Sequence, residues 1–507
     1  MTTLFERLQE TVPPKVSQVT GKPDAKALAG IDHLLVVLPP RPSAALWRKL
    51  PEGSKAQTLM RRAAKGSVPA VRTRINNKRQ TAMYVGSARA VAETFDNLTF
   101  ARKMVAAAIA EKAGVIGIWV LGFDDDVSER LTSHLLAAAL AAAFVMPTFK
   151  TKAPPPAIRS VRILGLDRPF DSDRLLAEAE GNNIVRYLTA LPGNKLDAYA
   201  CTALLEKMAA AEGWQYKRFG VAELTKMGAG AFLAVAQGNG DDSAAIVRLR
   251  YRPGAKNRSP DLTLVGKGII FDTGGTNAKP FMSMLDMHID MGGSAVAVGV
   301  LTALTRLRSD LSVDVWLAIT ENRIGPTAYK PQDVVTALNG KTIQTIHTDA
   351  EGRMALADAL VLACRDKPKA IVDYATLTGA CISAVTSRYC GVFTNRPDLH
   401  PVLKKCGRES GERVWPFPIG KEFLEELKSE TADIAQCSPN AGGDHILAAS
   451  FLNEFVDKKI PWVHVDLSAC TRKGGLAHVP TRLTGFGVRF SLALLLDHDL
   501  AGGIGPQ

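Results

Sequence analysis

The stretch VGKGIIFDTGGTNAKP, residues 265–280, sets charged side chains among glycines directly after an apolar run. We expect a strand over 261–265, and after it a glycine-rich loop that carries Lys267, Asp272 and Lys279. A phosphate-binding loop is excluded, because neither GxxxxGK[ST] nor GxGxxG occurs here. A plain glycine turn with solvated charges would be the interpretation if this stretch stood alone.

Further acidic residues follow in two short segments. Asp290 lies in MHIDMGG, just before an expected helix, and HTDAEGRMALADAL, residues 347–360, holds Asp349 and Glu351 two positions apart. That spacing places both on one side of an extended segment, and Arg353 continues it. An ordinary surface ion pair is the alternative. The apolar run after Arg353 indicates a buried helix, however, and buried carboxylates need a counter-charge from arginine or metal.

The rest of the chain alternates between apolar runs and helical patterns. This alternation predicts an α/β protein with a smaller N-terminal α/β domain and a larger C-terminal domain whose mixed sheet is sandwiched by helices. The expected boundaries are 1–165 for the N-terminal domain, 166–190 for a linking helix and 191–507 for the larger domain. The other expected strands are 31–38, 114–122, 312–319 and 369–373, and the expected helices include 101–112, 133–145 and 292–307.

The charged residues of these segments share one placement, at expected strand ends or glycine-rich turns. Ligands of α/β sheets bind where strands meet loops. A carboxylate-rich set favours Mn²⁺ or Mg²⁺, or paired Zn²⁺, and two metals about 3.5–4 Å apart form a clamp for hydrolysis. The carboxylates are Asp272, Asp290, Asp349 and Glu351, and the cationic residues beside them are Lys267, Lys279 and Arg353.

The formal net charge of +12 lies entirely in the first third of the chain. Residues 1–170 hold 25 basic and 13 acidic side chains, and the remainder is balanced. Such asymmetry is typical of a surface that binds polyanions, but also of a solvated basic face, and no nucleic-acid module is recognisable. The basic residues are densest at Arg61, Arg62, Lys65, Arg72, Arg74, Lys78 and Arg79.

Other features exclude whole classes of protein. The seven cysteines form no CxxC pair, which argues against a disulfide framework and a thiolate zinc site. The longest apolar run, 135–146, is shorter than the roughly 18–20 residues of a membrane span. The N-terminus MTTLFERLQE lacks the charged and apolar regions of a secretory signal. We therefore expect a cytoplasmic protein without membrane contact.

The motifs together resemble the leucyl aminopeptidase (cytosol aminopeptidase) family of dinuclear metallopeptidases. The family elements GKG-x-x-FD-[ST]-GG-x-x-x-KP, M-[KR]-x-DM-x-G and NTDAEGRL correspond to GKGIIFDTGGTNAKP, MHIDMGG and HTDAEGRM. Further matches run in family order from about 190 to 490, and they are GAGAFLAVAQGN, YATLTGA, GGDHILAASFLNEF, PWVHVDLSA and LTGFGVR. The N-terminal third carries no family motif, and only its α/β pattern fits.

The resemblance implies an aminopeptidase that releases N-terminal amino acids, Leu-type or broader, from peptides. It also implies two divalent cations, Mn²⁺ or Zn²⁺, in each subunit. Lys267, Asp272, Asp290 and Glu351 would hold one cation, and Asp272, Asp349 and Glu351 the other, with the Asp349 carbonyl. A lysine ligand must be a neutral amine, which neighbouring metal cations permit by lowering its pKa.

The resemblance assigns the catalytic groups as well. A water shared by the metals would be the nucleophile, and Lys279 would polarise the scissile carbonyl and stabilise the oxyanion. Arg353 would hold a bicarbonate ion as general base, together with backbone groups of Ala350, Gly352 and Leu377. The substrate pocket is expected from Met287, Thr376, Gly379, Ser468 and Thr471.

Two histidines depart from the family pattern. His347 replaces an Asn two residues before Asp349, and His288 replaces a Lys or Arg two residues before Asp290. Either imidazole could be an additional metal ligand or could support a neighbouring ligand. Because every metal-binding and catalytic position is kept, these departures bear on specificity and metal preference.

Two other functions compete with a metal-dependent aminopeptidase. The basic N-terminal third could give a DNA-binding role, in addition to catalysis or instead of it. A catalytically silent structural hexamer is the other alternative, and the complete ligand set argues against it. The resemblance further implies that the chain is a homohexamer.

Overall fold

The structure is a computed structural model that describes residues 4–9, 13–21, 23–63, 70–111, 114–152, 158–254, 259–440 and 442–502. The chain forms two units: Met1–Leu8, Gly181–Arg472 and Gly485–Gln507 make unit 1, and Gln9–Glu180 with Lys473–Thr484 makes unit 2. The expected boundaries at 165 and 191 differ from these, because helix α7 (Asp173–Ala190) contributes to both units and a late segment joins unit 2.

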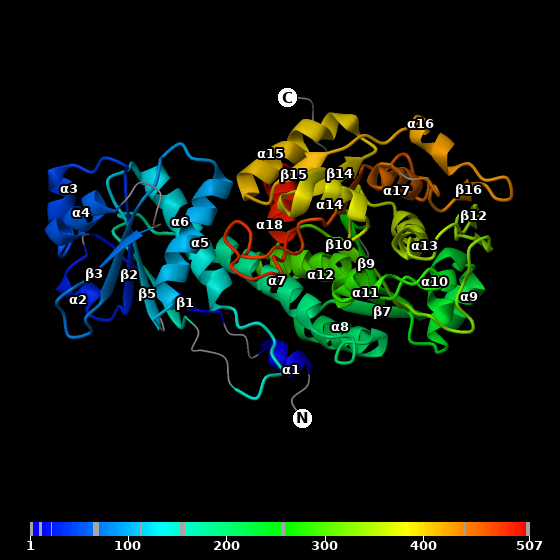
Figure 1. Ribbon diagram of the computed structural model, residues 1–507, viewed down its shortest axis with the longest axis horizontal. Coiled ribbons are helices and arrows are strands. Elements are labelled where there is room, and N and C mark those ends of the chain that lie inside the picture. The colour runs from blue at the N-terminus through cyan, green and yellow to red at the C-terminus, as the bar shows by residue number, and fades with distance from the viewer. Residues whose placement is uncertain are drawn as a thin grey trace. The chain divides into compact units, whose positions relative to one another are not determined.

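Unit 2 is built on a six-stranded sheet of order β1-β6-β5-β2-β4-β3, in which only β3 is antiparallel to its neighbour. Helices α2, α3 and α4 cover one face, and α5 and α6 cover the other (Figure 1). The strands are Lys15–Val19, His33–Leu38, Ala70–Arg74, Ala82–Ser87, Val115–Val120 and Ser160–Leu164 (β1–β6). The helices are Ala25–Leu28, Ala44–Lys49, Gly53–Arg62, Thr94–Ile109 and Asp125–Ala143 (α2–α6).

Strand β2 shows why both faces of this sheet are covered. Successive side chains of a strand point to opposite faces, so Leu34 and Val36 join the apolar cluster on one side and Leu35 and Val37 the cluster on the other. All six residues of β2 are buried. The strands expected at 31–38 and 114–122 and the helices expected at 101–112 and 133–145 are therefore confirmed as β2, β5, α5 and α6.

Several basic residues of unit 2 are paired with acidic neighbours. Arg72 and Arg74 lie 2.6 and 3.7 Å from the Glu111 carboxylate, and Arg79 pairs with Asp32. Their side chains are about half exposed, so water screens these pairs. Lys65, part of the same basic stretch, lies outside the described residues.

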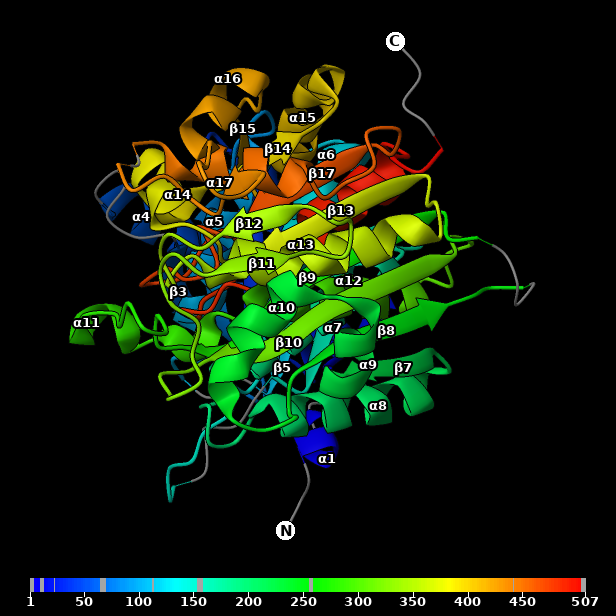
Figure 2. The same ribbon diagram turned by 90° about the vertical axis from the view of Figure 1, so that its right-hand side faces the viewer.

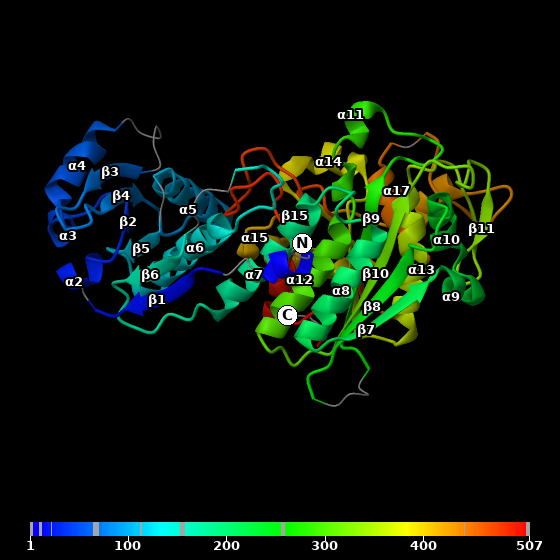
Figure 3. The ribbon, with the colours of Figure 1, turned by 90° about the horizontal axis from the view of Figure 1, so that it is seen from below.

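Unit 1 contains an eight-stranded mixed sheet of order β15-β14-β17-β13-β9-β10-β8-β7. Its four central strands, β17, β13, β9 and β10, are parallel to one another. Helices α8 and α12 lie on one face, and α10 and α13 on the other (Figure 3). The strands are Gln215–Gly220, Ala245–Tyr251, Leu262–Asp272, Val313–Asn322, Ala370–Ala375, Cys390–Thr394, Val414–Pro416 and Trp462–Asp466 (β7–β10, β13–β15, β17).

Strand β9 is longer than expected. The prediction that it ends at Val265 and that a loop follows is wrong, because β9 continues to Asp272. The glycines in GKG serve close packing: a Cβ on Gly266 would lie 2.5 Å from the Cα of Ser294 in α12. The absence of side chains on these glycines lets α12 approach β9 closely. Lys267 therefore belongs to β9 itself and not to a loop, and Asp272 is the last residue of this strand.

The remaining elements of unit 1 cover or extend the sheet. By length and composition alone the segment Phe281–Arg306 could cross a membrane, but most of it is buried inside the fold, as a core helix is. A small sheet of order β11-β12-β16 comprises Val334–Thr336, Thr342–Gln344 and Ile434–Ala435. The α-helices are Leu4–Gln9, Ala198–Glu212, Val221–Met227, Gly230–Ala236, Phe281–Met284, Gly292–Arg306, Glu351–Arg365, Gly379–Val385, His400–Ser410, Lys421–Leu424, Asp444–Asn453 and Val488–Leu492 (α1, α8–α18).

Candidate metal centre

The candidate site lies where the parallel strands of unit 1 end. Asp272 is the last residue of β9, and it is in register with Asn322, the last residue of β10. Thr376 directly follows β13, the neighbour of β9 on the other side. Because parallel strands bring their carboxyl ends to one edge, the topology gathers these polar side chains there.

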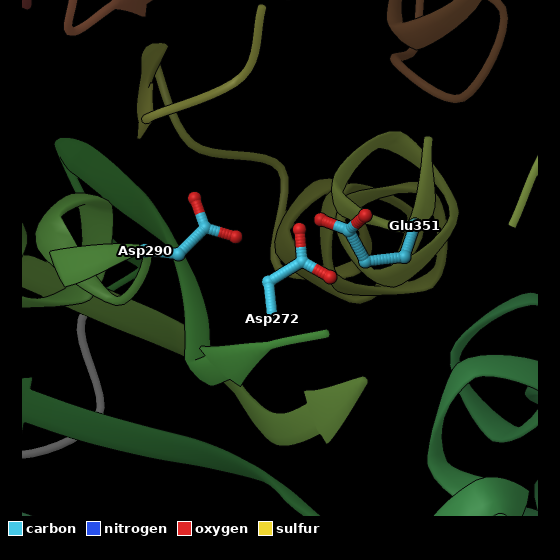
Figure 4. A group of neighbouring side chains, drawn as sticks. All are labelled: Asp272, Asp290 and Glu351. Atoms are coloured by element: carbon cyan, nitrogen blue, oxygen red, sulfur yellow. The ribbon is translucent and has the colours of Figure 1, made fainter. Parts of the chain in front are cut away.

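Three buried carboxylates converge at this edge. Asp272, Asp290 and Glu351 each offer an oxygen atom within 4.8 Å of the others, and Figure 4 shows the three side chains facing a common space. Asp290 follows the short 3₁₀ turn η2 (Met287–Ile289), and Glu351 is the first residue of α13. Among the described residues, no other group of His, Cys, Asp and Glu meets this spacing.

Lys267 neutralises one side of this group. Its Nζ lies 2.7 Å from Asp290 Oδ2 and 2.8 Å from Glu351 Oε1, and it donates to the Thr376 carbonyl at 3.0 Å. Burial alone would lower the pKa of Lys267, but the neighbouring carboxylates raise it above its ordinary value. Gly352 makes room for this side chain, because a Cβ there would lie 2.6 Å from Lys267 Cε.

Lys279 plays the same part on the other side. Its Nζ lies 2.8 Å from Asp272 Oδ2 and also pairs with Asp349 Oδ1. Burial would lower the pKa of Lys279, but Asp272 and Glu351 raise it above its ordinary value. Asp349 stands outside the group of three carboxylates, and the shared Lys279 ammonium connects it to Asp272.

Asp290, Asp349 and Glu351 bind their protons more tightly than exposed acids do. Burial, followed by the charge of Asp272, raises the pKa of Glu351 to about 8. Burial, partly offset by Lys267, raises the pKa of Asp290 to about 6. The pKa of Asp349 is also raised, first by burial and then by Asp272. Ionising this site therefore costs free energy that a bound cation would offset.

Two neutral side chains orient these carboxylates, and the sequence did not reveal either role. Asn322 Nδ2 donates to Asp272 Oδ1 at 2.8 Å, and Thr376 Oγ1 donates to Asp290 Oδ1 at 2.7 Å. Asn322 ends a fully buried strand beside β9, but it follows two other polar residues, Thr320 and Glu321, so no signal in the sequence indicated its role. Thr376 was expected in the substrate pocket, but its hydroxyl is bound to Asp290.

The donor set fits a divalent cation. Glu351 Oε2 is buried and accepts no hydrogen bond from the described residues. Four carboxylates also face only two ammonium groups, which leaves two negative charges without compensation when all four are ionised. A buried, acceptor-only cluster with this excess suits hard divalent cations bound through oxygen.

Arg353 follows Glu351 by two residues in the first turn of α13, and the expected extended arrangement of Asp349, Glu351 and Arg353 is wrong. Glu351 begins a helix, so Asp349, Glu351 and Arg353 do not lie along one side of an extended segment. Arg353 is buried, and its Nη2 donates to both carboxylate oxygens of Asp444 at 2.8 and 2.7 Å. Its Nη1 donates to the Gln436 carbonyl at 3.1 Å.

The histidines and the other pocket residues have local roles in this structure. His347 Nδ1 accepts the backbone N–H of Asp349 at 3.2 Å, and His288 is not in the converging carboxylate group. Ser468 is buried, and its hydroxyl donates to the Tyr389 carbonyl at 2.8 Å. Met287 begins η2, Gly379 begins α14 and Thr471 is partly buried.

Comparison with known proteins places the whole site within one matched region. The catalytic-domain model of the cytosol aminopeptidase family matches residues 183–492. A probable cytosol aminopeptidase from Acidovorax sp. (strain JS42) is 39% identical over 368 residues, which cover 72% of this chain and 73% of that protein.

Solved structures agree over nearly the full chain. An apo leucyl aminopeptidase from Trypanosoma cruzi has a TM-score of 0.82 at 25% identity, covering 96% of this chain and 98% of that one. The bottromycin maturation enzyme BotP, solved in complex with Mn, has a TM-score of 0.78 at 28% identity, covering 92% and 99%. The expected α/β fold is thereby confirmed.

Proposed function

The chain belongs to the cytosol aminopeptidase family and is a metal-dependent aminopeptidase, and we propose that it uses two divalent cations to release the N-terminal residue of peptides. The observation that carries the two-cation proposal is the arrangement of four carboxylates around two ammonium groups. Lys267 bridges Asp290 and Glu351, and Lys279 bridges Asp272 and Asp349. Each pair of carboxylates already holds one positive charge in the space between them.

Under this proposal, Lys267, Asp272, Asp290 and Glu351 hold one cation, and Asp272, Glu351 and Asp349 hold the other. The chemistry that such cations supply when bound is a water whose pKa is low enough for attack near neutral pH. Lys267 has to lose its proton to serve as a ligand, although its pKa in the metal-free site is raised. Cation binding should therefore release protons to solution.

Lys279 is the electrostatic catalyst in this proposal. Its side chain is largely buried, and Asp272 and Asp349 hold its ammonium at the edge of the cluster. A fixed ammonium at that position stabilises negative charge that develops on the carbonyl oxygen of the scissile bond. The excess of carboxylates also attracts the α-amine of a substrate, which favours cleavage at the N-terminus over cleavage within a peptide.

An anion on Arg353 would carry the proton from the attacking water to the leaving amine. The resemblance implies bicarbonate there, assisted by backbone groups of Ala350, Gly352 and Leu377. The N–H of Leu377 donates to Asp466 at 3.1 Å, and Arg353 pairs with Asp444. A bicarbonate ion at Arg353 would thus compete with the Asp444 carboxylate.

Hydrolysis of aminoacyl-p-nitroanilides by chelator-stripped protein tests the function. We expect no turnover without metal, turnover restored by Mn²⁺ or Zn²⁺, and none when the substrate α-amine is acylated. The rank order of a panel of residues gives the pocket preference, Leu-type or broader. Failure of every residue with every metal would contradict the proposal.

We also propose that the chain assembles as a homohexamer, as the family resemblance implies, and that it lies in the cytosol, as the name of its relatives suggests. Helix α11 projects from unit 1 (Figure 2), and its neighbouring Phe281 and Met282 are each 74% exposed. Adjacent exposed apolar side chains are typical of a protein–protein contact. Light scattering should give six times the 54.3 kDa chain mass, and a monomer would contradict the assembly.

DNA binding through the basic unit 2 remains a prediction that neither the site nor the named relatives support. The pairing of Arg72, Arg74 and Arg79 with acidic neighbours reduces the charge available to phosphates. Reversing the charges of Arg72, Arg74 and Lys78 tests it. Duplex affinity that is present, falls steeply with salt and disappears in this variant would support the role.

A further inference from the structure

Thr348 connects two of the loops that carry the site. It lies one residue before Asp349, and it is fully buried. Its hydroxyl donates to the Gly274 carbonyl at 2.7 Å and accepts the backbone N–H of Asn277, also at 2.7 Å. Gly274 and Asn277 belong to the loop that runs from the end of β9 to Lys279. One hydroxyl thus joins the loop of Lys279 to the turn of Asp349.

The contact between the two loops is reciprocal. Asn277 Oδ1 accepts the backbone N–H of Thr348 at 2.9 Å. The Thr348 carbonyl accepts the Tyr329 hydroxyl at 2.9 Å and Asn322 Nδ2 at 3.0 Å, and the same Asn322 amide donates to Asp272. The N–H, the carbonyl and the hydroxyl of Thr348 are therefore all bound. Asn277 stands at a variable position of the family element GG-x-x-x-KP, so the family pattern does not require its part in this contact.

Close packing leaves the loop before Lys279 little freedom. A Cβ on Gly274 would lie 2.6 Å from the Asn277 carbonyl oxygen and 3.0 Å from Asp349 Oδ1. The backbone N–H of Lys279 donates to the Thr273 carbonyl at 2.9 Å, which closes the loop on itself. The Asp349 carboxylate thus packs directly against the loop that presents the Lys279 ammonium.

Lys279 and Asp349 form an ion pair, but both lie in loops, so no strand or helix fixes the distance between them. Lys267, by contrast, belongs to β9. We propose that Thr348 is a positioning residue that sets the distance between Lys279 and Asp349. The inference rests on the proposed two-cation function, in which Asp349 holds one cation and Lys279 stabilises the oxyanion. A small displacement of such groups is costly, because both act only at a fixed distance from the scissile bond.

Metal binding gives a readout that does not depend on turnover. Thr348→Val keeps the shape of the side chain but leaves the Gly274 carbonyl and the Asn277 N–H without their hydroxyl partner. In calorimetric titration of chelator-stripped protein, one Mn²⁺ should bind about 10–100-fold more weakly and the other as in wild type. Thr376→Val, which acts on Asp290, should weaken the opposite ion. Equal weakening of both ions by Thr348→Val would overturn the proposal, because the whole site would then be disturbed.

Turnover tests the hydroxyl itself. At saturating Mn²⁺, Thr348→Val should lower kcat for leucyl-p-nitroanilide by about 10–100-fold, and Thr348→Ser, which keeps the hydroxyl, should restore most of the rate. Thr345→Val is the matched control. Thr345 is equally buried three residues earlier, and its Oγ1 has no hydrogen-bond partner among the described residues, so this variant should behave as wild type. Wild-type kcat in Thr348→Val, or a Thr348→Ser enzyme as slow as Thr348→Val, would overturn the proposal.

Asn277→Ala tests the same connection from the other loop, and it does so even if Thr348→Val fails to fold. Asn277 is partly exposed, and its loss should weaken the same Mn²⁺ as Thr348→Val does. Because both residues act on one connection, the double variant should lose less than the product of the two single effects. Effects that multiply in full would overturn the proposal, since the two residues would then act separately. Wild-type protein that binds fewer than two ions would contradict the proposed function itself, and with it this inference.

Discussion

Two ion pairs of nearly equal length show how burial separates the site in unit 1 from the surface of unit 2. Lys267 and Asp290 approach to 2.7 Å, and Arg72 and Glu111 to 2.6 Å. The first pair is almost fully buried, whereas the side chains of the second are 39% and 41% exposed. Water screens the exposed pair, which contributes about 0–1 kcal/mol to stability. The buried pair lies among further carboxylates whose pKa values are raised, and this unbalanced charge is what binds a cation.

The buried site of unit 1 and the exposed surface of unit 2 are compared most directly when a glutamate is replaced by alanine in each. Glu351→Ala removes a carboxylate from the buried cluster, so we expect loss of bound metal and a fall in turnover well beyond the roughly 100-fold cost of losing a supporting residue. Glu111→Ala removes an exposed partner of Arg72 and should leave both unchanged. Bound Mn²⁺ and leucyl-p-nitroanilide turnover are measured for each. A fully active Glu351→Ala enzyme would remove the basis of the site.

The next largest effect should follow from Lys279, the lysine that we propose faces the substrate. Lys279→Ala should lower kcat by about 10²–10³-fold, the usual cost of losing one group that stabilises an oxyanion. Steady-state kinetics at saturating Mn²⁺ separates kcat from KM. The matched change in unit 2, Arg79→Ala, should alter neither. An effect of Lys279→Ala on KM alone would show that the ammonium only assists binding.

The buried carboxylates should make metal binding depend on pH. Metal-free Glu351 has a pKa raised to about 8 and Asp290 a pKa raised to about 6, so protons compete with the cation below those values. Apparent Mn²⁺ affinity should rise between pH 6 and 8, by up to about tenfold per pH unit for each proton released. Calorimetry in two buffers of different ionisation enthalpy measures the protons released. A flat affinity with no proton release would contradict the raised pKa values.

A smaller loss is expected from the group that orients Asp290. Thr376→Val removes the hydroxyl that donates to Asp290 Oδ1, and it should weaken Mn²⁺ binding by about tenfold. Thr302→Val is the control, because this buried threonine of α12 bonds to the Val298 carbonyl of its own helix. Metal titration of both variants gives the difference. Equal affinities would show that Asp290 needs no support from Thr376.

The smallest effect belongs to the surface of unit 2. Arg72→Ala breaks an exposed ion pair, so we expect the free energy of unfolding to change by less than about 1 kcal/mol and turnover to stay the same. Chemical denaturation of wild type and Arg72→Ala at low and high salt measures this free energy. High salt should remove any difference between the two proteins, because salt screens exposed charges. A decrease of several kcal/mol in the free energy of unfolding would contradict the expectation that water screens the Arg72–Glu111 pair.

The sequence predicted the chemistry of the site better than its geometry. Asp272 and Asp290 were found because acidic residues beside glycines and apolar runs are unusual, and they do converge with Glu351. The expected end of β9 at Val265 was wrong because glycine permits close packing inside a strand as well as turning. The Glu351 spacing was misjudged because the residue begins a helix.

The partners that come from distant parts of the chain escaped the sequence altogether. Asn322 and Gln436 contact Asp272 and Arg353 only because the tertiary fold brings them there, over separations of 50 residues or more. No local pattern marks such residues as functional. A motif places the ligands, and the tertiary fold places the groups that orient them.

The central proposal is that three buried carboxylates and the partly exposed Asp349 bind two divalent cations, and that hydrolysis needs both. We would titrate Mn²⁺ into chelator-stripped wild-type protein, count bound metal per chain and follow leucyl-p-nitroanilide turnover in the same samples. The proposal predicts two bound ions per chain, with full turnover reached only as the second binds. Two ions bound without turnover, or full turnover with none bound, would contradict the account.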